Sequence, residues 1–202
     1  MPGKKVRAHL MTQALQESCQ IHDALQKDDA LQAQMLRIAQ AMVEVFEKGN
    51  KVLFCGNGGS AADAQHLAAE LAGRFYLDRS PLFAEALHVN SSFTTAVGND
   101  FGFEKVFSRL VGSKGQAGDM LVALSTSGNS ANVLAACEEA ARIDMIRVGF
   151  SGFTGGKLKE AVDYWLGVPS HDTPRIQEGH ILMGHIICQM VEDALFAESQ
   201  DA

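Results

Sequence analysis

The sequence predicts an α/β protein in which a doubly wound, five-stranded parallel sheet is sandwiched by helices. Short apolar runs such as Val52 to Cys55 alternate with helical segments from residue 51 onward, and such runs are typical of strands buried on both faces. Two helical segments precede the first strand, and one long helical segment follows the last. Because this alternation builds one sheet with right-handed crossovers, we expect a single domain over residues 1–202, with its α/β core and C-terminal helix in residues 51–202.

Residues 1–50 are expected to form a helical hairpin. Apolar residues recur at helical spacing over residues 5–26, and Asp28 or Asp29 caps a second helix that Gly49 ends. Two placements of this hairpin are open. It packs on a neighbouring subunit, or it covers one edge of its own sheet.

The other elements follow in order along the chain. An alanine-rich helix runs over residues 60–73. Residues 90–92 form the polar end of the second strand, and residues 98–100 form a turn. Thr173 and Pro174 are an N-cap and a first helical residue, and they open a long apolar helix that runs to about residue 196. Strands are expected at residues 83–89, 120–124, 145–150 and 164–168, and further helices at residues 101–111, 131–142 and 158–161.

The composition limits the classes of partner. A net charge of −7 argues against nucleic acid, which a basic surface would bind. No apolar run approaches the roughly 20 residues of a membrane span, and residues 1–5 lead into polar sequence rather than a signal peptide. We therefore expect no membrane partner. The four cysteines lack C-x-x-C spacing, which favours reduced thiols in a cytoplasmic protein.

The segment from Lys51 to Phe75 has the layout of an anion site. The strand ends in Gly56-Asn57-Gly58-Gly59, and a helix starts at Ser60, so backbone N–H groups and a helix N-terminus point at one place. Residues 56–61 also match the dinucleotide pattern G-x-G-x-x-A. That pattern requires an acidic residue closing the second strand, whereas this strand is expected to end in Val89-Asn90-Ser91. A nicotinamide cofactor is therefore the lesser interpretation.

A second turn, Ser125-Thr126-Ser127-Gly128-Asn129-Ser130, lies between a buried strand and a helix. Hydroxyl donors beside free N–H groups at a helix start suit a phosphate dianion without lysine or arginine. The alternative is a serine-rich turn with a spare N-cap. We favour a phosphate site.

Polar side chains on two helices form a second group of candidates. His66 and Glu70 are spaced i, i+4 and share one helix face, although a solvated face is the alternative. Gln177 and His185 point in broadly similar directions, about 12 Å apart along the long C-terminal helix. One metal joins them only if both side chains lean inward. For His180 we favour a structural role over a functional one.

Four blocks carry a resemblance to a known family: CGNGGSAADAQHLAAEL, VGNDFGFEKVFSR, LSTSGNSANVL and TPRIQEGHILMGH. Together they resemble the bacterial phosphoheptose isomerases of the sugar isomerase (SIS) domain family. The similarity covers nearly the whole chain.

The resemblance implies a homotetramer that converts sedoheptulose 7-phosphate to D-glycero-D-manno-heptopyranose 7-phosphate, an early step toward the heptose of lipopolysaccharide cores. It implies one Zn²⁺ per subunit, held by His66, Glu70, Gln177 and His185. Glu70 and His185 are the implied acid/base residues. The implied substrate contacts are Asn57, Gly58, Gly59, Ser60, Asp63, Glu70, Asn99, Asp100, Ser125, Thr126, Ser127, Ser130 and Gln177.

A related branch of the family offers a non-enzymatic alternative. Its members bind the replication initiator protein of some bacteria, and they lack the residues that match Glu70 and His185. This sequence keeps both, which favours the isomerase. Ketose–aldose interconversion needs a base near two carbons and a proton donor near two oxygens. A carboxylate bound tightly to zinc is a poorer base, so the sequence leaves open whether Glu70 binds metal, acts as the base, or does both.

Overall fold

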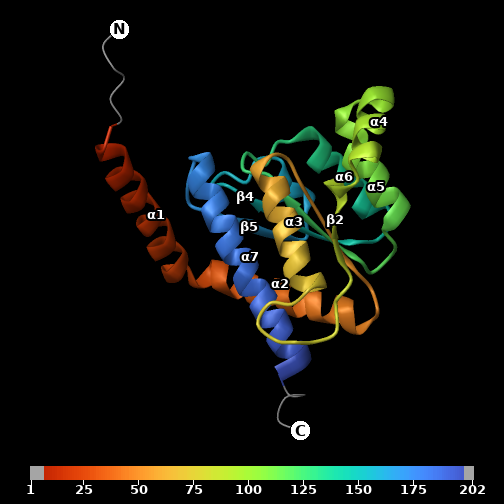
Figure 1. Cartoon of the computed structure of the whole chain (residues 1–202), viewed down its shortest axis with the longest axis horizontal. Helices are drawn as coiled ribbons and strands as arrows, with labels where there is room; N and C mark the ends of the chain where they lie inside the picture. The colour runs from red at the N-terminus through yellow and green to blue at the C-terminus, as the bar shows by residue number, and fades with distance from the viewer. Residues whose placement is uncertain (1–6, 198–202) are drawn as a thin grey trace.

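The computed structural model describes residues 7–197, and it has the predicted three-layer α/β architecture (Figure 1). Residues 5 and 6, where the first helix is predicted to start, lie outside the described residues. Within the described range all strand pairs are parallel and the strand order is β2-β1-β3-β4-β5. The strands are β1 Val52–Gly56, β2 Ala84–Ala86, β3 Met120–Leu124, β4 Ile146–Ser151 and β5 Tyr164–Gly167.

Helices cover both faces of the sheet. One face carries α2 (Asp29–Glu47), α3 (Gly59–Ala72) and α7 (Thr173–Phe196), and the other carries α4 (Ser91–Phe101), α5 (Val106–Lys114) and α6 (Ala131–Arg142). The helix α1 (His9–Lys27) extends along the outer side of α7. Within the described residues there are also three short 3₁₀ helices: η1 Leu87–Val89, η2 Phe103–Lys105 and η3 Leu158–Ala161.

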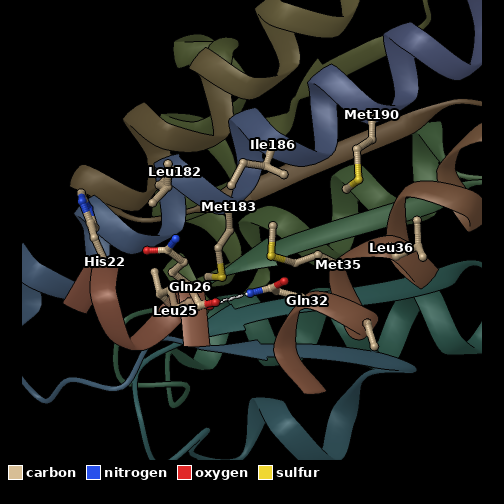
Figure 2. Close-up of a pocket in the computed structure, with 11 residues that line it drawn as sticks. His22, Leu25, Gln26, Gln32, Met35, Leu36, Leu182, Met183, Ile186 and Met190 are labelled. Atoms are coloured by element: carbon tan, nitrogen blue, oxygen red, sulfur yellow. Dashed lines mark hydrogen bonds between the residues drawn. The ribbon is translucent and has the colours of Figure 1, made fainter. Parts of the chain in front are cut away.

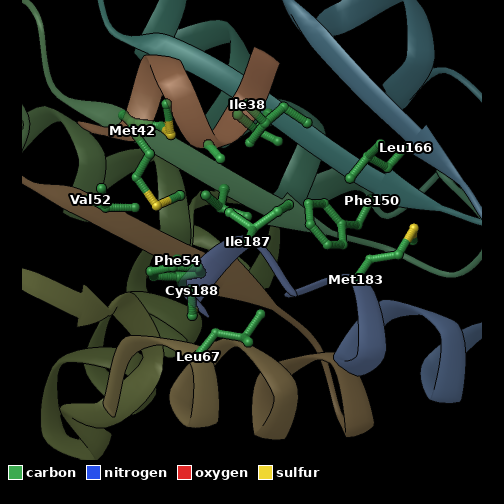
Figure 3. Packing of buried hydrophobic residues seen from close by; sticks show 14 of the residues in the cluster. Ile38, Met42, Val52, Phe54, Leu67, Phe150, Leu166, Met183, Ile187 and Cys188 are labelled. Carbon is green, nitrogen blue, oxygen red and sulfur yellow. The ribbon is translucent and has the colours of Figure 1, made fainter. Parts of the chain in front are cut away.

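The two faces of the sheet have separate hydrophobic cores, because successive strand residues point to opposite sides. Val52 and Phe54 belong to the core under α2, α3 and α7, whereas Leu53 and Cys55 belong to the core under α5 and α6. Figure 3 shows the first of these cores, with Phe54 among side chains from three helices. Every residue of β1 and β3 is buried, as the continuous apolar runs predict.

The two N-terminal helices differ in how much they bury. Seven residues of α2 are buried, and the Asp28 carboxylate caps this helix by accepting a 2.9 Å hydrogen bond from the Leu31 N–H. This helix therefore covers its own sheet, one of the two predicted placements. In the described part of α1 only Leu25 is buried. The helix is tied to α7 by a 2.7 Å hydrogen bond from Arg175 to the Ala14 carbonyl.

The region between β2 and α5 differs from the prediction. The strand expected over residues 83–89 is only three residues long, and η1 follows it. Asn90 does not end a strand but caps α4, since its side chain accepts a 3.0 Å hydrogen bond from the Phe93 N–H. The turn expected at residues 98–100 is helical and the chain turns at Gly102 instead, so the helix expected over residues 101–111 is divided among α4, η2 and α5. Capping by Asn90 starts the helix early enough to override the turn signal.

Within residues 7–197 none of the helices is both long and apolar enough to cross a membrane. The four cysteines are free thiols, as the spacing predicts, and three of them are buried.

Candidate active site

Two polar turns lie side by side at the carboxyl ends of β1 and β3. The two strands pair in register through Cys55 with Ala123 and Gly56 with Leu124, so the turns that follow them are neighbours. The carboxamides of Asn57 and Asn132 donate to each other, and both hydrogen bonds are 2.8 Å long. Between β1 and β3 the strand order reverses, because β2 is added on one side of β1 and β3, β4 and β5 are added on the other. Ligands of open α/β sheets bind at such a position.

Contacts within the protein hold the turn from Ser125 to Ser130 in shape. Ser125 is buried, and its hydroxyl lies 2.9 Å from the Ser130 hydroxyl. Gly128 has a φ of +66°, and a Cβ there would collide with the Gly155 carbonyl. Because the Ser130 hydroxyl bonds to Ser125, α6 begins without a side-chain cap. The uncapped N–H groups and the hydroxyls together suit an anion.

The start of α3 lies against α7. A Cβ at Gly59 would collide with the carboxamide of Gln177, so the end of the Gln177 side chain lies against the backbone of Gly59. Ser60 is buried within the same turn. Gln177 therefore points at the glycine-rich turn, about 10 Å along α3 from His66.

His66, Glu70 and His185 form one cluster further along α3 and α7. The His66 Nε2 atom lies 3.0 Å from Glu70 Oε1 and 3.0 Å from His185 Nε2. One donor atom from each of the three residues lies within 4.8 Å of the others. The structure brings these three together within one chain.

The chemistry of the cluster fits a divalent cation. Two imidazole nitrogens and one carboxylate oxygen are donors that suit zinc at an open catalytic site. Burial, together with the nearby His66, lowers the pKa of His185, although the Glu70 carboxylate opposes this shift. A lowered pKa favours the neutral imidazole, which is the form that binds metal.

Comparisons with known proteins point to one family. The SIS domain family matches residues 15–152. The phosphoheptose isomerase of Aneurinibacillus thermoaerophilus is 48% identical over 182 residues, which cover 90% of this chain and 92% of that protein. The phosphoheptose isomerase of Rhodospirillum rubrum is 58% identical over 147 residues, which cover 73% of this chain and 78% of that protein.

A solved structure has the same fold over most of the chain. The phosphoheptose isomerase from Neisseria gonorrhoeae matches with a TM-score of 0.86 at 41% identity, covering 92% of this chain and 98% of that one. The chain belongs to the phosphoheptose isomerases of the SIS domain family. This membership confirms the resemblance carried by the four sequence blocks, and it makes the chain an enzyme of the isomerase class.

Three further residues are substrate contacts implied by the family resemblance. One of them lies near the cluster and the other two lie on α4. Asp63 precedes His66 on α3, and burial raises the pKa of its carboxyl to about 6 while His66 opposes the shift. Asn99 and Asp100 lie at the exposed end of α4, where the Asn99 amide donates a 2.8 Å hydrogen bond to Asp100. Among the described residues no hydrogen bond links this pair to Ser125 or to His66.

His180 has the structural role that the sequence favours. Its side chain is fully buried, and its ring lies edge-on to that of Phe150 with 5.8 Å between the centroids. Burial lowers the pKa of His180 to about 4. This histidine is therefore a neutral core residue at pH 7.

Sequence reasoning missed Asn132. Its side chain is 4% exposed, and its amide pairs with that of Asn57. Its position in the second turn's motif, two residues after Ser130 at the start of α6, was the available signal. The pairing partner lies on another element, so no local pattern could indicate it.

Two hollows differ in character. The hollow beside the cluster, lined by residues of α3 that include His66 and Glu70, has a volume of about 450 Å³ and is open to solvent. A larger groove of about 550 Å³ lies between α1, α2 and α7, and Figure 2 shows that Met35, Met183, Ile186 and Met190 point into it. This groove is mainly apolar and contains none of the cluster residues. The open hollow is the candidate active site.

Proposed function

We propose that the chain interconverts sedoheptulose 7-phosphate and D-glycero-D-manno-heptopyranose 7-phosphate. The observation that carries this proposal is the cluster of His66, Glu70 and His185 in a chain with phosphoheptose isomerase relatives. A carboxylate and an imidazole within hydrogen-bonding distance of a common centre supply the two proton-transfer groups that an aldose–ketose isomerase needs.

In the proposed reaction a base removes a proton from C1 of the ketose, and the oxygen on C2 gains a proton. The resulting enediol then receives a proton at C2, and the oxygen on C1 releases one, which leaves an aldehyde at C1. Glu70 is the proposed base at the carbons, and His185 is the proposed proton carrier at the oxygens. The lowered pKa of His185, caused first by burial, supports this role, because a neutral imidazole both accepts and donates protons.

The phosphate of the substrate is proposed to bind at the turn from Ser125 to Ser130. Ser125, Thr126, Ser127 and Ser130 supply hydroxyl groups there, and the uncapped start of α6 supplies backbone N–H groups. Asn57, Gly58 and Gly59 border the same edge of the sheet from the neighbouring turn. Ser60 is buried and supports that turn.

We propose zinc as the resident cation, one per subunit, with His66, Glu70 and His185 as ligands. Gln177 is the proposed fourth ligand, and its side chain would have to turn from Gly59 toward the cluster. A divalent cation held by these residues would polarise the substrate and stabilise negative charge that develops on its oxygens. Metal analysis of protein purified without chelator tests this assignment. Protein that is free of metal and fully active in EDTA would contradict it.

We propose a homotetramer with the active sites near subunit interfaces. His66 is 49% exposed and its hollow is open in a single chain, so a second copy would close the site. Three apolar side chains of α1 are exposed, Leu10, Met11 and Leu15, and the C-terminal end of the same helix borders the apolar groove. Light scattering tests this state, and a monomer at micromolar concentration would contradict it.

The proposed biological setting is the cytoplasm, where the product enters heptose synthesis for lipopolysaccharide cores, and residues 1–202 are proposed to act as one domain. The reaction is tested by incubating the protein with sedoheptulose 7-phosphate and following aldose formation by NMR. Fructose 6-phosphate, a ketose phosphate with one carbon fewer, is the control substrate. Absence of aldose formation from the seven-carbon substrate would contradict the proposed function.

A further inference from the structure

Arg79 and Glu192 form a buried ion pair between the loop that follows α3 and the second half of α7. Their side chains are 3% and 2% exposed, and Arg79 Nε lies 2.9 Å from Glu192 Oε1. The Glu192 carboxylate also accepts hydrogen bonds from the backbone N–H groups of Phe75, Tyr76 and Leu77, at 2.9, 2.6 and 3.0 Å. One carboxylate on α7 thus holds three consecutive residues of the loop. We call this arrangement the Arg79–Glu192 clamp.

The guanidinium of Arg79 completes the end of α3. Its Nη2 atom donates to the Glu70 carbonyl at 2.9 Å, and its Nη1 atom donates to the carbonyls of Leu71 and Gly73 at 2.8 and 3.2 Å. The last carbonyl groups of a helix have no partner within the helix, and Arg79 supplies one. A planar guanidinium reaches these carbonyls and Glu192 together, which a lysine ammonium cannot do.

The clamp lies beside the active-site cluster on both helices. On α3 it bonds to the backbone of Glu70. On α7, Glu192 lies about two turns beyond His185, on the same side of the helix. The loop that Glu192 holds also reaches the cluster, since the centroids of the Phe75 and His185 rings are 5.7 Å apart. The helices that carry the three donors are therefore joined beside those donors.

The clamp keeps its charge although it is buried. Burial alone would raise the pKa of Glu192, but the three backbone N–H groups and Arg79 outweigh it, and the pKa is lowered. Removing one partner of such a pair leaves an uncompensated charge in the protein interior, which is strongly unfavourable. This makes the clamp a rigid connection rather than an exposed ion pair.

We propose that Arg79 and Glu192 are positioning residues, which fix the placement of α3 against α7 so that the donor atoms of His66, Glu70 and His185 meet at one point. This inference rests on the proposed metal site. A positioning role differs from a purely stabilising one in its consequence: changing a positioning residue changes cation binding. Residues that orient metal ligands typically change metal affinity 10–100-fold when they are replaced.

The test compares cobalt binding by wild type, Arg79→Lys and Glu192→Asp. Both variants keep the charges of the pair but shorten or simplify its contacts. The matched control is Asp119→Asn, which disrupts another buried pair: Asp119 lies 2.6 Å from Lys51 Nζ and accepts backbone hydrogen bonds from Lys51 and Gln116. None of these bonds reaches the cluster or the loop that Glu192 holds.

We expect the dissociation constant for Co²⁺ to rise at least about tenfold in both clamp variants, with a changed visible absorption of the bound ion. Asp119→Asn should lower the melting temperature yet bind Co²⁺ as wild type does. Clamp variants that bind Co²⁺ with wild-type affinity and spectrum would overturn the inference while leaving the metal site in place. A wild type that binds no Co²⁺ would overturn the metal site and the inference with it. If Arg79→Lys fails to fold, Glu192→Asp decides alone.

Discussion

The side-chain amides of Asn57 and Asn132 are each other's partners, through two hydrogen bonds of 2.8 Å that join the turns after β1 and β3. Each carboxamide uses one N–H and one oxygen lone pair in this ring, so each keeps one donor and one acceptor site free. The orientation of the Asn57 amide, a proposed substrate contact, is therefore set by a residue on another helix. The pair makes the two turns one unit.

Replacing Asn132 by Asp should weaken sugar phosphate binding. The change removes the N–H group that donates a hydrogen bond to the Asn57 side-chain oxygen. It also places a negative charge at the start of α6, beside the proposed phosphate position. Loss of one hydrogen bond alone amounts to about 1 kcal/mol, roughly a fivefold change in affinity, and the added negative charge weakens phosphate binding further. We expect KM for the sugar phosphate to rise at least about tenfold in steady-state assays.

The control for this variant is Asn50→Asp. Asn50 donates a 3.1 Å hydrogen bond to the Ala117 carbonyl, away from both turns, and the change adds the same charge. It should leave KM unchanged. An unaltered KM in Asn132→Asp would show that the amide pair does not orient the substrate site.

Removing two hydroxyl groups tests the proposed phosphate turn. The double variant Ser125→Ala with Ser127→Ala keeps Gly128 and the backbone of the turn, but it loses the 2.9 Å contact between Ser125 and Ser130. Each lost hydrogen bond to a charged group weakens binding by about 1.5–3 kcal/mol. Calorimetric titration should show affinity for sugar phosphate lowered by at least about 100-fold, with an unchanged circular dichroism spectrum.

Ser113→Ala is the matched control, because the Ser113 hydroxyl bonds only to the Leu110 carbonyl of its own helix among the described residues. Unchanged affinity in the double variant would contradict the placement of the phosphate site at this turn.

How far the sequence predicts the fold depends on whether the deciding contacts are local. The apolar spacing of residues 131–142 and 158–161 predicts both helices within the bounds observed. The prediction for the region after β2 is wrong because Asn90 caps a helix there. A polar residue such as Asn90 fits the end of a strand equally well, so its type alone does not decide between the two. Polar residues at an element boundary do not by themselves say which element they belong to.

The same distinction separates the parts of the candidate site. The i, i+4 pair of His66 and Glu70 is readable from helical spacing. Its meeting with His185 depends on how α3 and α7 pack, and only the family resemblance pointed to it. The Arg79–Glu192 clamp could not be predicted from the sequence, because a charged residue in a loop is ordinarily exposed and this one is buried.

The buried His180 should make stability depend on pH. Its pKa is lowered by burial from 6.5 to about 4, so below pH 6.5 the unfolded chain takes up a proton that the folded chain does not. The resulting stability is present above pH 6.5 and is lost as the pH falls toward 4. Between pH 7 and pH 5 the loss amounts to about 2 kcal/mol. Urea denaturation at the two pH values measures it.

The variant His180→Gln isolates this contribution from the other titrating groups. Its free energy of unfolding should fall about 2 kcal/mol less than that of wild type between pH 7 and pH 5. His22→Gln, at an exposed position of α1, should show the wild-type difference. Equal pH dependence in wild type and His180→Gln would contradict the neutral, buried state of this histidine.

The last prediction separates an isomerase from the family branch that binds the replication initiator protein. Glu70→Gln keeps the shape of the side chain but removes the proposed base, and His185→Ala removes the imidazole that lies 3.0 Å from His66. Loss of one acid/base group typically lowers the rate about 10²–10⁴-fold. We expect kcat to fall by at least this factor in both variants with sedoheptulose 7-phosphate as substrate.

Both variants should still fold and bind the sugar phosphate, because the proposed phosphate turn lies on other elements than the cluster. The sugar phosphate should therefore raise their melting temperatures as it raises that of wild type. Glu44→Gln, an exposed change on α2, serves as the control with wild-type activity. Loss of kcat with binding retained identifies the cluster as the catalytic centre. A wild type that is inactive on the sugar phosphate but binds the initiator protein would instead identify the chain as a regulator. Glu70 and His185 would then have no role in proton transfer.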